Sequence, residues 1–198
     1  MKIKGILFDA GGVYLKGEFT DFVNKAYKVL KIKGRFKASQ DVFFDPELNK
    51  GNVTIETCFR RFFNVPISKS QMKRLISIWN ETWKTDRFMV NLVKSLKKKY
   101  LVAIFSNSDK NNYENVYKKR GWYKYFDSLI LSHELGVMKP DRKIYKIALK
   151  RLGLKPEECL FIDDQKECLL TARNIGMKTL LFESNYKLKR DLKRMKLI

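Results

Sequence analysis

The sequence predicts an α/β fold, a parallel sheet with a helical segment inserted after its first strand. Short apolar runs alternate with amphipathic helical patterns over most of the chain, as expected for parallel strands connected by helices. Residues 15–86 depart from this alternation and show helical spacing only. Several expected strands also end on polar residues, which indicates a site at one edge of the sheet.

The first expected strand ends on a carboxylate. Ile6, Leu7 and Phe8 form an apolar run suited to a strand buried on both faces, and Asp9 follows at its carboxyl end. Open α/β sheets hold their ligands at that edge. Two glycines, Gly11 and Gly12, follow after Ala10, and they let the backbone approach a metal or a phosphate closely.

The inserted segment predicts three helices and one long loop. The first helix follows a polar cap at Thr20 or Asp21, the second begins at Thr54, and the third begins at the capping box of Ser68 to Gln71. A loop is expected from Asp41 to Gly51. Because the aromatic side chains of these helices recur at helical spacing, we expect them to form a helical core rather than a ligand cage.

From Asp86 onward the pattern predicts a Rossmann-like arrangement. A helix begins there, a short one surrounds Tyr113 to Tyr117, one follows Lys139-Pro140-Asp141 with the proline in its first turn, and one ends at Gly176. Four further strands are expected, at residues 101–105, 128–131, 159–162 and 179–182.

Polar groups at the strand ends should meet in space, because parallel strands share one carboxyl edge. They are Asp9, Ser106 with Asn107, Lys139, and Asp163 with Asp164. Carboxylates brought together repel one another, and a divalent cation relieves the repulsion. An oxygen-only ligand set suits Mg²⁺.

This set of side chains predicts chemistry on a phosphoryl group. Asp9 can act as a nucleophile on phosphorus, with Lys139 as a second cation. The Ser106 hydroxyl and the amide of Asn107 can hold the phosphoryl oxygens as charge develops on them.

On these residues the sequence resembles the haloacid dehalogenase-like (HAD) hydrolases, mostly phosphatases that pass through an aspartyl-phosphate. The matching motifs are Ile6–Val13, Ile104–Asn107, Lys139-Pro140 and Phe161–Asp164. The resemblance implies an α/β core formed by residues 1–14 and 87–198 and a small α-helical cap formed by residues 15–86.

The resemblance also implies a role for each site residue. Asp9 would be the nucleophile and a metal ligand, the carbonyl of Gly11 a second ligand, and Asp164 the third, with Asp163 in support. Ser106 and Lys139 would bind and orient the phosphoryl group.

One position departs from the family pattern. Most phosphatases of the family have a second Asp two residues after the nucleophile, where it protonates the leaving alcohol, and this chain has Gly11. A backbone carbonyl survives the change, but a general acid, worth roughly 10²- to 10⁴-fold in rate, does not. The only histidine, His133, lies near the Lys139 loop, and we expect it to be structural.

The amino-acid composition indicates which binding partners and which cellular location to expect. The net charge of +21 suits anionic substrates, but the lysines are dispersed and concentrate only in the tail from Lys187 to Lys196, so a nucleic-acid partner is not expected. The three cysteines lack metal-site spacing and are expected to be buried thiols. No apolar run is long enough for a membrane span or a signal peptide, which predicts a cytoplasmic protein.

Three functions remain open from the sequence. The first is a magnesium-dependent phosphatase acting on a small phosphorylated metabolite. The second is a 2-haloacid dehalogenase, in which Asp9 attacks carbon; members with that activity need no metal and lack the paired acids seen here as Asp163 and Asp164. The third is a binding or regulatory protein that has lost turnover and uses its basic surface on RNA or another anion.

Overall fold

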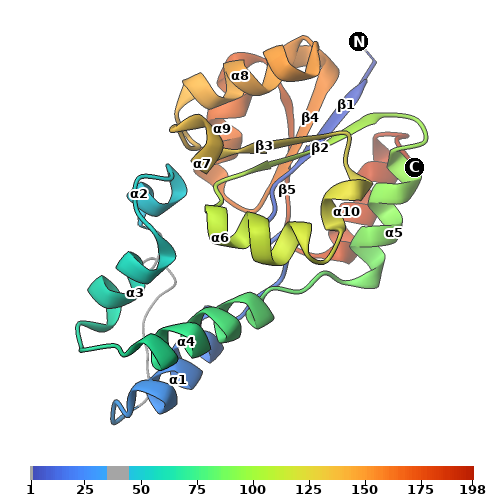
Figure 1. Cartoon of the computed structure of the whole chain (residues 1–198). Coiled ribbons are helices and arrows are strands. Elements are labelled where there is room, and N and C mark those ends of the chain that lie inside the picture. Colours follow the sequence, from blue (N-terminus) through green and yellow to red (C-terminus); the bar gives the residue numbers. More distant parts are fainter. Residues whose placement is uncertain (1, 35–44) are drawn as a thin grey trace.

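A five-stranded parallel sheet forms the centre of the molecule (Figure 1). The computed structural model describes residues 2–34 and 45–198. The strand order is β3-β2-β1-β4-β5. The strands are β1 (Gly5–Phe8), β2 (Leu101–Ser106), β3 (Ser128–Leu131), β4 (Cys159–Asp163) and β5 (Lys178–Leu181), which confirms all the expected strands to within about a residue.

The register of the sheet sets the level of the site. Phe8 of β1 pairs with Ile104 of β2 on one side and with Ile162 of β4 on the other. The next residue, Asp9, donates its backbone N–H to the Ile162 carbonyl at 2.9 Å. Asp9 and Asp163 therefore leave the sheet at the same level, on neighbouring strands.

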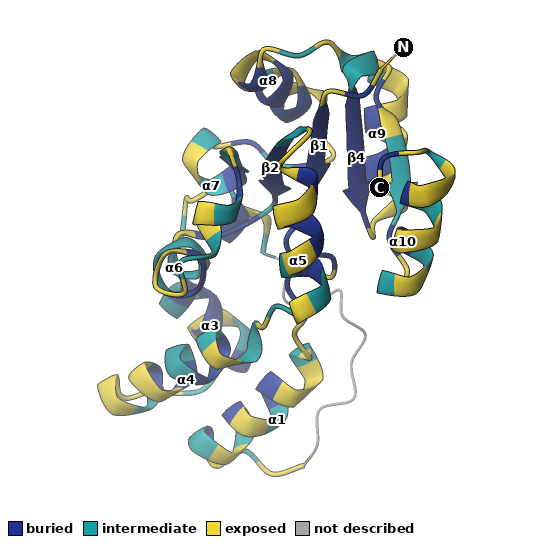
Figure 2. Ribbon diagram, turned by 90° about the vertical axis from the view of Figure 1, so that its right-hand side faces the viewer, coloured by how far each residue is buried: buried dark blue, intermediate teal, exposed yellow. Residues whose placement is uncertain are grey.

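Helices cover both faces of the sheet. Helices α8 (Arg142–Leu152) and α9 (Lys166–Ile175) pack on one face, and α5 (Arg87–Leu96) and α10 (Asn185–Arg194) pack on the other. In Figure 2 the central strands β1, β2 and β4 are buried, while the outer faces of α5 and α10 are exposed. Shorter elements complete the α/β part: α6 (Lys110–Asn112), the π-helix η2 (Tyr113–Lys118), the 3₁₀ helix η3 (Trp122–Tyr125), α7 (Ser132–Leu135) and the 3₁₀ helix η4 (Pro156–Glu158).

The helices between β1 and α5 have a hydrophobic core of their own. They are α1 (Phe19–Leu30), α2 (Pro46–Asn49), α3 (Ile55–Phe63) and α4 (Lys69–Thr82). Phe22 lies fully buried in this core, with ring centroids 5.3 Å from Phe59 and 4.9 Å from Trp79. The expected aromatic core is confirmed.

Four local predictions need comment. Helix α1 begins at Phe19 with Glu18 at the N-cap, so the caps expected at Thr20 or Asp21 are wrong. Thr54 and the Ser68 capping box are confirmed. The expected loop from Asp41 to Gly51 contains α2, whose first turn is capped by the Asp45 carboxylate; residues 41–44 lie outside the described part.

Two further elements differ from expectation. The N-cap of α8 is Asp141, whose carboxylate accepts the Lys143 N–H at 2.8 Å. Pro140 therefore lies ahead of the helix and not in its first turn. The charged tail forms α10, which the sequence analysis did not predict and which buries Leu188 and Leu192 against the sheet.

A short stem joins the α1–α4 helices to the sheet. Lys16 and Lys84 form an antiparallel bridge, in which the N–H of each donates to the carbonyl of the other at 2.7 and 2.9 Å. Farther along, the Trp79 indole N–H donates to Asn112 Oδ1 at 3.0 Å, and the Ser132 hydroxyl donates to the Asn49 carbonyl at 2.5 Å. Hydrogen bonds therefore connect the α1–α4 helices to the rest of the molecule at more than one point.

Among residues 2–34 and 45–198, no helix combines the length and the apolar character that crossing a bilayer requires.

Candidate functional site

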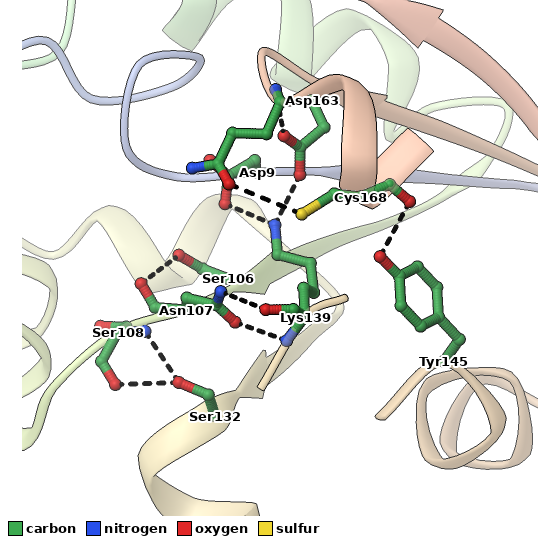
Figure 3. A network of polar contacts seen from close by, with 10 residues as sticks. Asp9, Ser106, Asn107, Ser108, Ser132, Lys139, Tyr145, Asp163 and Cys168 are labelled. Carbon is green, nitrogen blue, oxygen red and sulfur yellow. Dashed lines mark hydrogen bonds and ion pairs between the residues drawn. The ribbon is translucent and has the colours of Figure 1, made fainter. Parts of the chain in front are cut away.

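A buried lysine joins two acids at the carboxyl edge of the sheet (Figure 3). The Lys139 ammonium donates to Asp9 Oδ1 at 2.8 Å and to Asp163 Oδ2 at 2.6 Å. The three side chains are only 2%, 8% and 0% exposed, respectively. The structure thus brings together the ends of β1 and β4 and the loop before α8, as the strand-end pattern predicts.

A third acid completes the cluster. Oxygens of Asp9, Asp163 and Asp164 all lie within 4.8 Å of one another. The cluster has three carboxylates and one neighbouring ammonium, so it has excess negative charge, with Asp9 and Asp163 buried and Asp164 exposed. Burial, followed by the nearby Asp163 and Asp164 charges, raises the pKa of Asp9 to about 7 against the opposing effect of Lys139.

The donor set fits a hard divalent cation. The pKa of Asp164 is also raised, first by burial and then by Asp163. Carboxylate oxygens without sulfur or imidazole suit Mg²⁺, which binds through one or two carboxylates together with water and substrate oxygens. Asp9, Asp164 and the backbone carbonyl of Gly11 are the groups that would hold such an ion.

Gly11 and Gly12 differ in whether a side chain would fit at their positions. Gly12 has φ +75°, and a Cβ there would lie 2.1 Å from Asp164 Oδ2, so a side chain at this position collides with the acid cluster. A Cβ on Gly11 meets nothing within 4 Å. Gly12 is therefore required by close approach, whereas Gly11 borders open space.

The side chain of Asn107 holds Lys139 in place. Its amide nitrogen donates to the Lys139 carbonyl at 2.9 Å, and its oxygen accepts the Lys139 N–H at 2.8 Å. Because one side-chain N–H and the side-chain oxygen form this backbone pair, the side chain of Asn107 fixes the position of the loop that carries the lysine.

Asp163 and Ser106 are also engaged with their surroundings. Asp163 uses one oxygen for Lys139 and the other to accept the Gln165 N–H at 2.7 Å, which fixes the turn into α9. Ser106 is 1% exposed, and its hydroxyl donates to the Asn107 carbonyl at 3.3 Å. Asp163 thus holds the lysine and the turn into α9, and Ser106 is the last residue of β2, directly before Asn107.

Three residues near the site were not singled out from the sequence. The Ser132 hydroxyl accepts the Ser108 N–H at 3.0 Å, and the Tyr145 hydroxyl donates to the Cys168 carbonyl at 2.8 Å. Tyr117 of η2 is buried, and burial raises the pKa of its hydroxyl. A serine or tyrosine outside the motifs gives no sequence signal of this kind, because its partners come from other loops.

His133 makes structural contacts. Its Nδ1 lies 2.9 Å from the Ser108 carbonyl, and burial lowers the pKa of the ring. Its ring also packs beside Tyr113, with centroids 6.0 Å apart. Since Nδ1 is occupied by a backbone carbonyl, the half-buried ring fastens the loop after β2 to α7, in line with the structural role expected for it.

The fold matches solved structures over nearly its whole length. A HAD family enzyme of Bacteroides thetaiotaomicron, in complex with magnesium and inorganic phosphate, superposes with a TM-score of 0.74 and 25% identity, covering 91% of this chain and 94% of that one. An L-2-haloacid dehalogenase of Xanthobacter autotrophicus, with chloropropionic acid covalently bound, superposes with a TM-score of 0.69, covering 99% and 84%. At 17% identity the second likeness shows the fold alone.

Curated relatives match over shorter stretches. A glyceraldehyde 3-phosphate phosphatase of Methanothermobacter thermautotrophicus is 31% identical over 94 residues, 47% of this chain and 42% of the relative. An (S)-2-haloacid dehalogenase of Burkholderia cepacia is 29% identical over 119 residues, 60% and 52%. A bifunctional epoxide hydrolase 2 of Rattus norvegicus is 39% identical over 72 residues, 36% of this chain but only 13% of that protein. The matches therefore span about half or less of each of these relatives.

The sequence profile of haloacid dehalogenase-like hydrolases matches residues 3–176, which include β1, β2, the Lys139 loop and β4. Together with the acid cluster at the edge of a parallel sheet and the HAD enzymes that share the fold, this match establishes that the chain belongs to the haloacid dehalogenase-like hydrolase family.

Proposed function

We propose that the protein is a magnesium-dependent phosphatase that hydrolyses a small phosphorylated metabolite through an aspartyl-phosphate on Asp9. The observation that carries the proposal is the cluster of Asp9, Asp163 and Asp164, in which Asp9 and Asp163 also pair with the ammonium of Lys139. This excess of carboxylate oxygen suits a divalent cation, which can in turn bind phosphoryl oxygens, and the HAD enzyme with magnesium and inorganic phosphate has the same fold.

In the first step a carboxylate oxygen of Asp9 forms a bond to phosphorus while the ester P–O bond breaks, and the leaving oxygen takes a proton from water to become the alcohol. Lys139 holds Asp9 by an ion pair and offers positive charge to the phosphoryl oxygens. Ser106 donates its hydroxyl to the same group. Bound Mg²⁺, held by Asp9, Asp164 and the Gly11 carbonyl, would neutralise charge on the phosphoryl oxygens.

In the second step water attacks phosphorus, the bond to Asp9 breaks, and inorganic phosphate leaves with the carboxylate restored. No acid side chain follows Asp9 at Gly11, so the departing alcohol receives little help from that position. We therefore expect a preference for substrates with acidic leaving groups, such as aryl or acyl phosphates.

We further propose that residues 15–86 act as a cap over this edge. The supporting observations are the contacts of Trp79 with Asn112 and of Asn49 with Ser132, which bring α4 and the end of α2 against the loops that follow β2 and β3. Side chains of such a cap would select the non-phosphate part of the substrate.

The test is a panel of phosphate esters assayed with and without Mg²⁺. We expect phosphate release that requires the cation, falls to background in Asp9→Asn, and rises steeply as the pKa of an aryl leaving group falls. A rate that does not vary with leaving-group pKa would count against the role assigned to Gly11.

A dehalogenase is the second candidate, favoured by the missing acid at position 11 and by the Burkholderia relative. Against it stand the clustered acids Asp163 and Asp164, which are costly to hold together beside Asp9 without a cation. Halide release from 2-chloropropionate that persists in a chelator would establish it over the phosphatase.

A further inference from the structure

Ser132 lies where three segments of the chain meet. It is the first residue of α7 and is fully buried. Its hydroxyl accepts the N–H of Ser108, on the loop that follows β2, at 3.0 Å, and it donates to the carbonyl of Asn49, at the end of α2, at 2.5 Å. One buried side chain therefore connects the α/β part to the helices between β1 and α5.

The Ser132 hydroxyl has two carbonyl oxygens within reach. The carbonyl of Asn49 is at 2.5 Å and that of Ser108 is at 3.2 Å. Because a serine hydroxyl has a single hydrogen to donate, the nearer carbonyl of Asn49 takes it in the structure. If residues 45–51 moved away, the hydroxyl would turn to the Ser108 carbonyl. The direction of this hydroxyl thus depends on whether α2 is docked on α7.

Gly51 makes the fit between α2 and α7 close. It follows α2 with φ +79°, and a Cβ there would lie 2.7 Å from the carbonyl oxygen of His133. The imidazole Nδ1 of His133 lies 2.9 Å from the Ser108 carbonyl. Ser132 and His133 therefore hold the backbone of Ser108 and also contact the turn at the end of α2.

The segment that Ser132 holds leads directly to the site. Ser108 lies two residues after Ser106, and Asn107, between them, pairs with the backbone of Lys139 through one N–H and the oxygen of its side chain. Since the three residues are consecutive, a displacement of Ser108 is passed both to the Ser106 hydroxyl and to the Lys139 loop.

We propose that Ser132 is a positioning residue that couples the docking of residues 45–51 to the position of residues 106–108. The serine at the end of β2 then has its place at the phosphoryl group only while α2 is docked on α7. The proposal rests on the phosphatase and cap functions proposed above. Ser132 acts through Ser108 and not on the substrate itself.

Ser132→Ala removes the connection from the side of the α/β part. The Ser108 N–H and the Asn49 carbonyl each lose a partner. We expect kcat for p-nitrophenyl phosphate to fall roughly three- to tenfold, the effect of about one hydrogen bond. KM should change by less than about twofold, because the side chains that the substrate contacts are retained.

Gly51→Ala breaks the same connection from the side of α2. Its Cβ would overlap the His133 carbonyl, so the turn must move away from α7 and from the Ser132 hydroxyl. We expect a similar loss of kcat, roughly three- to tenfold. Gly153→Ala is the matched control, because Gly153 also has a positive φ, of +65°, but a Cβ there meets nothing within 4 Å. It should cause a similar backbone strain and leave kcat within about twofold.

The losses from the two variants should not multiply. In the Ser132→Ala background, Gly51→Ala should lower kcat by less than about a further twofold, because the connection is already broken. Losses that multiply in full would overturn the inference, since each substitution would then act by a separate route. An unchanged kcat in either single variant would overturn it as well.

Hydrogen exchange over residues 106–110 gives a readout that requires neither turnover nor the Ser132 variant. Gly51→Ala should raise the exchange rate there at least about threefold, while Gly153→Ala should not, because the coupling runs from α2 through α7 to Ser108. Equal exchange in Gly51→Ala and the wild type would overturn the inference, whether or not Ser132→Ala folds.

The two proposals can fail separately. A wild-type protein that releases no phosphate from any ester, but in which Gly51→Ala raises exchange over residues 106–110, would refute the phosphatase and keep the coupling. Magnesium-dependent phosphate release that is the same in the wild type, Ser132→Ala and Gly51→Ala would refute the coupling and keep the phosphatase.

Discussion

The ammonium of Lys139 lies 2.8 Å from the carboxylate of Asp9, and both side chains are almost wholly buried. The residues are 130 positions apart, and the parallel sheet brings them together. Because a buried carboxylate needs a partner, this contact links the stability of the site to its chemistry.

Lys139→Met should destabilise the protein and abolish turnover. Removing one member of a buried ion pair leaves Asp9 and Asp163 uncompensated and costs about 3–5 kcal/mol. The loss of unfolding free energy should be smaller at pH 5 than at pH 8, because Asp9 can take up a proton at the lower pH. Urea unfolding at both values measures it, with the exposed Lys143→Met as control. Equal losses at the two pH values would contradict this explanation.

Gly11→Asp should raise turnover of alkyl phosphates, with an upper bound of roughly 10²- to 10⁴-fold set by general acid catalysis. The new side chain enters open space. Gly12→Ala is the paired control: its Cβ would overlap Asp164, so magnesium-dependent activity should be lost. Steady-state rates on ethyl and p-nitrophenyl phosphate separate the two effects, and a Gly11→Asp enzyme that gains nothing on the alkyl ester would show that the acid comes from elsewhere.

Affinity for Mg²⁺ should increase as the pH rises from 6 to 8. The pKa of Asp9, raised to about 7 without a cation, means that protons and Mg²⁺ compete for the same carboxylate in this range. In the cation-free protein, the proton on Asp9 contributes to the free energy of unfolding at low pH. This contribution disappears as the pH rises through about 7. Calorimetric titrations in two buffers should detect proton release at pH 6.5 and almost none at pH 8.5. The prediction fails if the affinity is the same throughout.

Arg120→Ala should loosen α4 from the α/β part. The guanidinium donates to the Asn80 carbonyl at 2.9 Å and to the Trp83 carbonyl, which are the free carbonyls at the end of that helix. We expect faster hydrogen exchange over residues 76–84 and a few-fold higher KM. Arg151→Ala is the control, because Arg151 likewise donates to a carbonyl, that of Leu129, but within the α/β part. Identical exchange in both variants would exclude this role of Arg120.

The strands could be predicted from the sequence because each is a short apolar run with a polar or glycine-rich end. A run such as Leu160 to Ile162 differs clearly from the amphipathic helices around it. Helix α10 escaped prediction because its outward-facing residues are densely charged, and its two buried leucines, Leu188 and Leu192, are too few to stand out. The π-turn at Tyr113–Lys118 escaped because one extra residue in a turn leaves the apolar spacing almost unchanged.

The candidate site, like the fold, could be predicted from the sequence only in part. Asp9, Lys139, Asp163 and Asp164 could be grouped from the sequence because strand direction alone places them at one edge. The pairing of Asn107 with the Lys139 backbone could not, since it depends on how two loops meet.

The paired hydrogen bonds of Lys16 and Lys84 have a consequence for protein engineering. Opposed residues of an antiparallel bridge have Cα atoms roughly 4.5–5.5 Å apart, a gap that a two-residue hairpin turn spans. The α1–α4 helices are thus attached through a junction narrow enough to be cut and resealed. Such an excision would yield a minimal enzyme, and helices from a relative could be grafted at the same two lysines to exchange substrate preference.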